Sequence, residues 1–282
     1  MIGKTIAHYK ILQKLGEGGM GVVYKAHDTK LDRTVALKFL PAHLSASEDD
    51  KTRFLQEARA AASLTHPNIC TIFAIEEYTD EGESGSRFFF AMEYLEGKTL
   101  RHAMNDIGIQ RALDIGSQVA EGLAAAHDKG IVHRDVKAEN IMARPDGRVQ
   151  IMDFGLAKIR GGSVLTRAGS TVGTIGYMSP EQVQGMDVDH RADIFSLGVI
   201  LYEMSSGSLP FKGVHDAAIM YEIVNVQPPP PSEIKNGVPA ELDRIIGKCL
   251  AKDREDRFQS ARDIAVDLKI LRKQSGSGIS TG

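Results

Sequence analysis

The chain has 282 residues, of which 42% are hydrophobic and 25% are charged. A chain of this length and composition can bury a substantial core, and it suits one large domain or two lobes better than a single small fold. The formal net charge of -3 gives no general reason to expect binding to nucleic acid or to a membrane surface. Any partner must therefore be inferred from a local site.

The cysteines and the apolar runs exclude further classes of protein. Only Cys70 and Cys249 occur, outside any Cys-x-x-Cys spacing, so neither a disulfide framework nor a structural zinc site is supported. The longest apolar run, from Ile194 to Met204, is shorter than the ~20 residues that a membrane helix needs, and no signal peptide is recognisable. We therefore expect a cytoplasmic chain without a membrane segment.

The first residues predict a hairpin around a glycine-rich turn. Residues 9 to 15 and 21 to 28 carry β-branched and aromatic residues on either side of Gly16, Gly18 and Gly21. The Gly-x-Gly-x-x-Gly spacing alone is a weak signal, and in a dinucleotide-binding fold it opens a helix, whereas here a strand follows. Glycines let backbone amides approach phosphates closely. The turn is therefore either a cover over phosphates or a plain hairpin turn.

A lysine inside the next apolar run is a candidate phosphate ligand. Residues 34 to 40 predict a strand that contains Lys38, although a lysine in a strand is usually a surface residue. A helix is predicted from Ser45 to Leu64 by a candidate capping box and by apolar residues at helical spacing. Glu57 lies in its middle, where it is either a solvated helix charge or the partner of Lys38.

The composition changes near residue 95. Residues 71 to 77 and 87 to 94 are predicted to pair as strands across a polar, glycine-rich loop. The pattern then becomes helical, so we expect a first lobe of residues 1–95 and a second lobe of residues 96–273. Residues 274–282 are rich in serine and glycine and predict a flexible linker or tail.

Two long helices are predicted in the second lobe. The apolar residues between 109 and 129 follow a helical stripe, and Gly130 lies where a C-terminal cap glycine belongs. A second helix-forming run extends from residue 194 to residue 204. The first of these helices leads directly into the segment with the most specific chemistry.

That segment runs from residue 133 to residue 140. It places a carboxylate (Asp135), an ammonium group (Lys137) and a carboxamide (Asn140) on one short loop. These groups suit acceptor orientation, neutralisation of phosphate charge and Mg²⁺ coordination, respectively. Alone, the segment could be a polar turn, but the Asp-Phe-Gly of residues 153 to 155 argues against that interpretation.

The order His-Arg-Asp-x-Lys-x-x-Asn followed by Asp-Phe-Gly resembles the catalytic core of the eukaryotic-type protein kinases. The resemblance covers nearly the whole chain, and residues 18 to 21 and 193 to 198 are similar to bacterial Ser/Thr kinases of that superfamily. It implies a two-lobed α+β fold, with a small antiparallel β-sheet lobe that carries one helix and a larger, mainly helical lobe. It also implies ATP and Mg²⁺ as cofactors and protein Ser or Thr as the phosphoryl acceptor.

The resemblance assigns roles to the residues of the catalytic segment. Asp135 would orient the acceptor hydroxyl and receive its proton, while Lys137 would steady the transferring phosphoryl group. Asn140 and Asp153 would supply oxygen ligands to Mg²⁺. Asp135 and Lys137, together with the Lys38 and Glu57 pair, are thus the expected catalytic residues.

The resemblance also implies a set of ATP-binding residues. Lys38 would bind the α- and β-phosphates and form an ion pair with Glu57. Met92 would control the depth of the adenine pocket, and the backbone groups of Glu93 and Leu95 would bond the adenine edge. The full set is Leu15, Gly16, Gly18, Gly21, Val23, Ala36, Lys38, Met92, Glu93, Leu95 and Met142.

Several residues are expected to support this site by resemblance. His133 would brace the catalytic loop, and Asp193 would anchor its backbone. Arg257 would pair with Glu181. Phe154 would pack internally and couple the aspartate of Asp-Phe-Gly to the helix that carries the glutamate partner of the phosphate-binding lysine.

Residues 161 to 176 resemble an activation segment, because they are rich in Gly, Ser and Thr and too long and polar for a buried connection. A phosphate on this segment could pair with Arg134 and order the loop. The alternative is a disordered surface loop. The candidate phosphosites are Ser163, Thr166, Ser170 and Thr171.

Two rival functions fit the sequence less well. An ATP-binding but inert scaffold conflicts with the presence of every expected catalytic and metal-binding side chain, and the intact stretch from residue 153 to residue 181 favours a protein substrate over a small molecule. Glu139, inside the catalytic loop, could favour a basic residue near the acceptor. Analogy adds a homodimer for autophosphorylation and a longer, membrane-anchored receptor of which this chain would be the cytosolic kinase domain.

Overall fold

The computed structural model describes residues 1–18, 21–41, 48–79, 86–104, 107–154 and 175–277. The chain divides into two compact units, of which the first comprises Met1–Glu96 and the second begins at Gly97. The boundary predicted from the sequence lay between Leu95 and Glu96. Within the described ranges, no helix combines the length and the apolar character that crossing a membrane requires.

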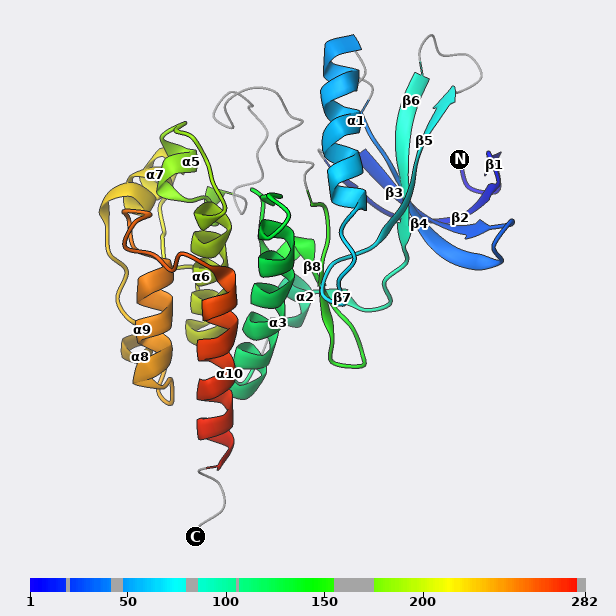
Figure 1. The fold of residues 1–282 in the computed structure, drawn as a ribbon. Helices are drawn as coiled ribbons and strands as arrows, with labels where there is room; N and C mark the ends of the chain where they lie inside the picture. Colours follow the sequence, from blue (N-terminus) through cyan, green and yellow to red (C-terminus); the bar gives the residue numbers. More distant parts are fainter. Residues whose placement is uncertain (19–20, 42–47, 80–85, 105–106, 155–174, 278–282) are drawn as a thin grey trace. The chain divides into compact units, whose positions relative to one another are not determined.

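The described strands of the first unit form a six-stranded sheet in the order β1-β2-β3-β4-β6-β5 (Figure 1). The pairs are antiparallel. The strands are β1 Thr5–Ile6, β2 Tyr9–Gly18, β3 Gly21–Asp28, β4 Arg33–Phe39, β5 Ile72–Thr79 and β6 Ser86–Glu93. Both predicted hairpins are confirmed, because β2 pairs with β3 up to Gly18 and Gly21, and β5 pairs with β6.

Helix α1, Glu48–Ala62, packs on one face of this sheet. The ring centroid of Phe54 lies 5.1 Å from that of Phe88 and 5.7 Å from that of Phe90, both on β6. Alternate residues of a strand point to opposite faces, so Phe89 faces the other side. The predicted cap of this helix, Ser45, lies outside the described residues.

The opposite face of the sheet carries its own apolar core. Phe89 belongs to a buried cluster that also contains Tyr9, Ile11, Ala26, Val35, Leu37, Phe39 and Ala91. The central strands β4 and β6 are therefore covered on both faces. This explains why their sequences are almost continuously apolar instead of alternating with polar residues.

The second unit is mainly helical. Its described helices are α2 Leu100–Ala103, α3 Ile109–His127, α5 Pro180–Val183, α6 Arg191–Ser206, α7 Asp216–Asn225, α8 Pro231–Ile234, α9 Ala240–Cys249 and α10 Ala261–Ser277. Helix α3 packs against α6 and α10, and α6 packs against α9 (Figure 1). A Cβ atom added at Gly198 would lie 2.6 Å from Cβ of Cys249, so glycine permits the close approach of α6 and α9. Helix α6 is buried almost all round and forms the core of the unit.

The C-terminal helix extends further than the sequence predicted. We expected a flexible tail from residue 274, whereas α10 continues to Ser277. Helix α10 packs along α3, and Arg272 of α10 forms an ion pair with Asp114 of α3. Tertiary packing therefore stabilises a helix in a segment whose composition alone favours a linker. The rest of the predicted tail, residues 278–282, lies outside the described residues.

A small sheet in the second unit positions the predicted catalytic loop. Its strands are β7 Lys98–Thr99, β8 Ile141–Ala143 and β9 Val149–Ile151, in the order β7-β8-β9. Strands β8 and β9 are antiparallel, with Ile141 opposite Ile151. The residues just before β8 and just after β9 are therefore neighbours. These are the ends of the catalytic loop and the start of Asp-Phe-Gly.

Candidate active site

Asp135 lies at the centre of a polar cluster in the catalytic loop. The Nζ atom of Lys137 lies 2.9 Å from Oδ2 and 3.1 Å from Oδ1 of Asp135. Asn140 donates from Nδ2 to the backbone oxygen of Asp135 at 2.8 Å and to its Oδ2 at 3.2 Å. The carboxylate is thus fixed by a cation and an amide, and it can serve as the acceptor for a hydroxyl proton.

His133 connects the catalytic loop to the segment after β9. Its ring is fully buried, and Nε2 lies 2.8 Å from the backbone oxygen of Met152. A carbonyl oxygen can only accept, so Nε2 carries the hydrogen, and Nδ1 accepts from the backbone N–H of Asp135 at 3.2 Å. The ring also packs edge-on against Phe154, with 4.6 Å between centroids. His133 therefore fixes the backbone of the loop at Asp135.

Asp193, in the first turn of α6, fixes the backbone just before Asp135. It is completely buried and accepts from the N–H groups of His133 and Arg134, each at 2.8 Å, and from Nε2 of His127 at 2.8 Å. Burial acts to raise the pKa of Asp193, but the hydrogen bond from His127 and the neighbouring charges outweigh it and lower the pKa. The buried side chain is therefore an anion that receives donors from three directions.

Two non-glycine residues of this region have a left-handed backbone. The φ angle is 67° at Arg134 and 63° at Asp153. Such angles are uncommon outside glycine and persist where surrounding contacts impose them. At Arg134 the Asp193 carboxylate is such a contact, and next to Asp153 the N–H of Met152 donates to the oxygen of Asn140 at 2.8 Å.

Asn140 and Asp153 fit a small oxygen-seeking cation. The Nδ2 group of Asn140 is committed to Asp135, which leaves its Oδ1 as the acceptor side of the amide. Within the described ranges, no group of three or more His, Cys, Asp or Glu side chains gathers as a metal site. One amide oxygen and one carboxylate suit Mg²⁺, which usually completes its shell with phosphates and water.

In the first unit, Lys38 lies on the face of the sheet that α1 covers. It is 4% exposed and lies opposite Phe90, whose ring contacts Phe54 of α1. Residues that pair directly across a sheet share a face. Glu57 follows Phe54 by three positions and therefore shares the sheet-facing side of α1. The fold thus brings the predicted lysine and glutamate to one interface between β4 and α1.

Three other predicted ATP-binding residues lie on that same face. Val23 is opposite Lys38, and Ala36 is opposite Met92. Because Ala36 and Lys38 are two positions apart on β4, all four side chains line one side of the sheet. The sequence motif alone did not show this arrangement.

The glycines of the predicted phosphate cover lie at the end of the first hairpin. Gly16 and Gly18 belong to β2, where the register shifts between Lys14 and Gly16. Gly21 begins β3 with a φ angle of 109°, and a Cβ atom there would lie 1.8 Å from the oxygen of Phe39. Only glycine can occupy that position without rearrangement of β4.

The other predicted ATP-binding residues have different surroundings. Leu15 is exposed and Leu95 is buried. The backbone N–H of Glu93 donates to the oxygen of Thr71 at 2.9 Å, and its carbonyl oxygen accepts from Sγ of Cys70 at 3.7 Å. Met142 belongs to the second unit, on β8.

Residues 161–174 of the predicted activation segment lie outside the described residues. The candidate phosphosites, Ser163, Thr166, Ser170 and Thr171, all lie outside the described residues. Their predicted partner Arg134 is described, and its guanidinium has no ion-pair partner among the residues with a described structure. Its backbone is nevertheless fixed on both sides, by Asp193 and by Gln182.

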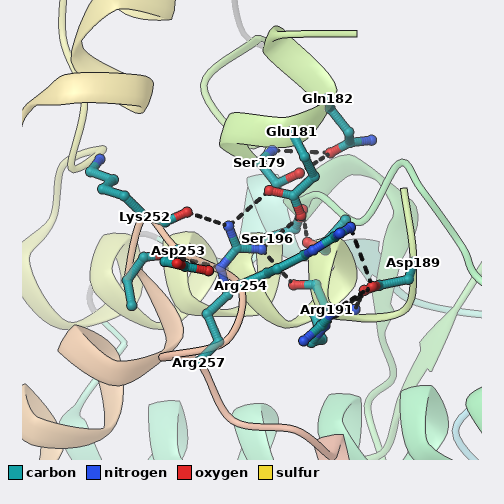
Figure 2. Close-up of polar contacts among 12 residues, drawn as sticks. Ser179, Glu181, Gln182, Asp189, Arg191, Ser196, Lys252, Asp253, Arg254 and Arg257 are labelled. Carbon is teal, nitrogen blue, oxygen red and sulfur yellow. Dashed lines mark hydrogen bonds and ion pairs between the residues drawn. The ribbon is translucent and has the colours of Figure 1, made fainter. Parts of the chain in front are cut away.

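Figure 2 shows how α5, which follows the predicted activation segment, is attached to the loop between α9 and α10. Arg257 donates from both terminal nitrogens to the two carboxylate oxygens of Glu181, at 2.7 and 2.8 Å. It also donates to the backbone oxygens of Ala251, Arg191 and Lys252. Burial acts to raise the pKa of Glu181, but the hydrogen bond from Arg257 lowers it below its usual value. The ion pair is buried, and both carboxylate oxygens accept hydrogen bonds from Arg257.

Gln182 is a site residue that the sequence analysis missed. Its Nε2 donates to the backbone oxygen of Arg134 at 2.8 Å, and its Oε1 accepts from the N–H of Ser179 at 3.0 Å (Figure 2). It therefore links the start of α5 to the residue before Asp135. The Ser-Pro-Glu-Gln order at residues 179 to 182 is a capping-box pattern that could have identified it.

Comparison with known proteins identifies the relatives of this chain. The model of the protein kinase domain family matches residues 9–266. A probable serine/threonine-protein kinase of Clostridium perfringens is 38% identical over 285 residues, which cover 100% of this chain and 41% of that protein. The serine/threonine-protein kinase PknB of Mycobacterium leprae is 39% identical over 272 residues, which cover 95% of this chain and 43% of that protein. The chain thus spans about two fifths of the length of these curated relatives.

Solved structures agree with the fold. The crystal structure of the PknI kinase domain of Mycobacterium tuberculosis superposes with a TM-score of 0.75 at 29% identity, and the match covers 98% of this chain and 99% of that one. The sequence prediction of a small antiparallel β-sheet lobe with one helix and a larger helical lobe is thereby confirmed.

Proposed function

Because this chain belongs to the protein kinase domain family, we propose that it transfers the γ-phosphoryl group of ATP to serine or threonine hydroxyls of protein substrates. The observation that carries the proposal is the environment of Asp135, whose carboxylate contacts Lys137 and Asn140. Its backbone N–H donates to His133, and Asp193 accepts from the N–H groups of the two residues before it. The printed names of its relatives, serine/threonine-protein kinases, support the same acceptor class.

Asp135 receives the acceptor proton in this reaction. A bond forms between the acceptor oxygen and the γ-phosphorus while the bond from that phosphorus to the bridging oxygen breaks, and ADP is released. Lys137, 2.9 Å from the Asp135 carboxylate, places a positive charge beside the acceptor oxygen and the phosphoryl group. Asp135 and Lys137 thus both act on the acceptor oxygen.

Asn140 and Asp153 would hold Mg²⁺. The cation supplies neutralisation of the phosphate charge during transfer. The amide of Asn140 orients its oxygen because its nitrogen is tied to Asp135. The same contact therefore couples the metal ligand to the proton acceptor.

The covered face of the first sheet supports ATP binding. We assign Lys38, paired with Glu57, to the α- and β-phosphates, and the neighbouring Val23, Ala36 and Met92 to the adenine side. Their common face on β3, β4 and β6 is the supporting observation. The rest of the assigned set is Leu15, Gly16, Gly18, Gly21, Glu93, Leu95 and Met142.

Regulation by phosphorylation is part of the proposal. A phosphate on Ser163, Thr166, Ser170 or Thr171 would give the Arg134 guanidinium an anionic partner next to the catalytic loop. Autophosphorylation of this segment within a homodimer is the route that we propose. The setting that we propose is the cytoplasm, which suits the two free, buried cysteines.

Intact-mass spectrometry after incubation with MgATP tests the function. We compare the unchanged chain with Asp135→Asn and with Asp32→Asn, which makes the same chemical change at a side chain that is 94% exposed. The expected result is phosphate addition by the unchanged chain and by Asp32→Asn. Asp135→Asn should react at least about 100-fold more slowly, because positioned proton transfer contributes roughly 10² to 10⁴.

The negative outcomes are equally informative. Equal phosphate addition by Asp135→Asn and the unchanged chain would show that the reaction does not need the Asp135 carboxylate. If the unchanged chain gained no phosphate and also left a generic protein substrate unmodified, the proposed activity would be refuted and the inert-scaffold function would be favoured.

A further inference from the structure

Arg101 of α2 contacts three side chains from three other segments of the second unit. Its Nε donates to Oε1 of Glu139 at 2.8 Å, and one terminal nitrogen donates to Oε1 of Glu203 at 2.5 Å. The other terminal nitrogen donates to the hydroxyl of Tyr177, which in turn donates to Oε2 of Glu203. A single guanidinium thus closes a four-residue cluster, Arg101, Glu139, Tyr177 and Glu203.

The cluster carries more negative than positive charge. Two carboxylates share one guanidinium, and Oε2 of Glu139 accepts no hydrogen bond within the described chain. Glu203 is 11% exposed, while Arg101 is 32% exposed and Glu139 is 41% exposed. Burial acts to lower the pKa of Arg101, but the hydrogen bonds to Glu203 and Glu139 raise it. The guanidinium is therefore charged, and it is open to solvent on one side.

The cluster connects the catalytic loop to the residues that follow the predicted activation segment. Glu139 stands between Lys137 and Asn140 in that loop, on the short 3₁₀ turn of residues 138–140. Tyr177 follows directly on the predicted activation segment, and its backbone oxygen accepts from Ser196 of α6 at 2.7 Å. A peptide whose hydroxyl reaches Asp135 would therefore pass close to these carboxylates.

We propose that Arg101 is a specificity-determining residue that occupies, from within the chain, the position where Glu139 and Glu203 would otherwise bind a basic side chain of the substrate. The inference rests on the proposed kinase function. Carboxylates bind arginine best through paired, charge-assisted hydrogen bonds, and here the intramolecular guanidinium already makes them. The substrates are then Ser/Thr segments that need no arginine beside the acceptor. Glu139 considered alone led to the opposite expectation.

A set of peptides and variants tests this proposal. The parent peptide has one threonine among neutral residues, and each relative carries a single arginine at one of the three positions before or after the threonine. The unchanged domain is expected to phosphorylate all of them with kcat/KM values within about two- to three-fold, because the carboxylates are already paired. Arg101→Met, which keeps much of the length of the side chain, is expected to favour one arginine position by roughly ten-fold or more.

A double substitution separates specificity from stability. In Arg101→Met/Glu139→Gln the acquired preference should disappear, because a carboxylate that binds the incoming arginine is gone. Arg262→Met is the matched control, since this arginine is 67% exposed on α10 and pairs with Asp128 instead of the cluster. Arg101→Gln is the second variant, because it keeps donors for Glu203 and Tyr177 and should fold even if the methionine variant does not.

Peptide binding, measured by fluorescence anisotropy, gives a readout that does not need turnover. Arg101→Met or Arg101→Gln should bind the preferred arginine peptide more tightly than the parent peptide, and the unchanged domain should not discriminate. Folded variants that show no arginine preference in binding or in turnover would overturn the inference while the kinase function stands. Absence of phosphorylation by the unchanged domain would instead count against the proposed function.

Discussion

Arg257 and Arg101 each connect distant parts of the second unit, but their surroundings differ. Arg257 has a fully buried side chain and meets one carboxylate, Glu181, with both of its oxygens engaged. Arg101 is one third exposed and meets two carboxylates, Glu139 and Glu203. The first pair is balanced in charge, whereas the second cluster has a surplus carboxylate.

The difference shows how burial and charge balance decide the role of an arginine. Removing one partner of a balanced, buried pair is costly, because the other partner becomes an uncompensated buried charge. Arg101 is partly exposed, so water screens its contacts and its removal should cost less. Once it is removed, an arginine of the substrate can take its place between the two carboxylates. We therefore assign a structural role to Arg257 and a selective role to Arg101.

The largest expected effect is the loss of Arg257. Arg257→Met leaves the Glu181 carboxylate buried without a partner and should lower the free energy of unfolding by about 3–5 kcal/mol. Urea unfolding followed by circular dichroism measures this change. Arg262→Met, at an exposed ion pair, should change stability by no more than about 1 kcal/mol. If the two variants proved equally stable, the Arg257–Glu181 ion pair would not stabilise the fold as its contacts indicate.

An intermediate effect concerns acid stability. The lowered pKa of Glu181 means that its ionised form is stabilised in the folded state, so this contribution is present above the ordinary glutamate pKa of 4.5 and is lost as the pH falls through the lower pKa of the folded state. The urea midpoint of the unchanged domain should therefore fall more steeply below pH 4.5 than that of Glu181→Gln. Glu96→Gln, at an exposed position, is the control. Parallel pH profiles for Glu181→Gln and the unchanged domain would contradict the prediction.

The smallest expected effect on stability is that of Arg101→Met. Its contacts are partly solvated, so we expect a loss of about 1 kcal/mol, which corresponds to roughly 2–4 °C in Tm for a chain of this size. Thermal unfolding measures this shift. An arginine-bearing peptide should raise the Tm of Arg101→Met, because a ligand that binds only the folded state stabilises it, and should leave that of the unchanged domain nearly constant. A loss as large as that of Arg257→Met would erase the distinction between the two arginines.

Local pattern was sufficient for most of the fold. Short β-branched runs around glycines predicted the hairpin of β2 and β3, and the apolar stripe between residues 109 and 129 predicted α3. In these elements the local preference of the sequence agrees with the final fold. The C-terminal end of α10 was missed, because contacts with α3 outweigh the composition of that segment.

The residues of the site likewise fall into a group that the sequence indicated and a group that only the fold brings together. The sequence by itself determined Asp135, Lys137 and Asn140 as a group, since they lie within six residues and a short loop must bring them together. It also indicated the family through the order of its motifs. The pattern carried no signal that Val23, Ala36 and Met92 share one face with Lys38, because strand register decides that.

Only the tertiary structure decided the partners of Arg101, whereas the family resemblance had already predicted that Arg257 pairs with Glu181. Arg257 and Glu181 are 76 residues apart in sequence, and Arg101 and Glu203 are 102 residues apart. Charged residues occur throughout the sequence, so neither distance nor composition marks Arg101 and Glu203 as partners. The fold of the second unit brings α2 to α6, and it brings α5 to the loop between α9 and α10, where Arg257 lies. Burial and the number of carboxylates at each site then determine whether an arginine holds the fold together or selects a substrate.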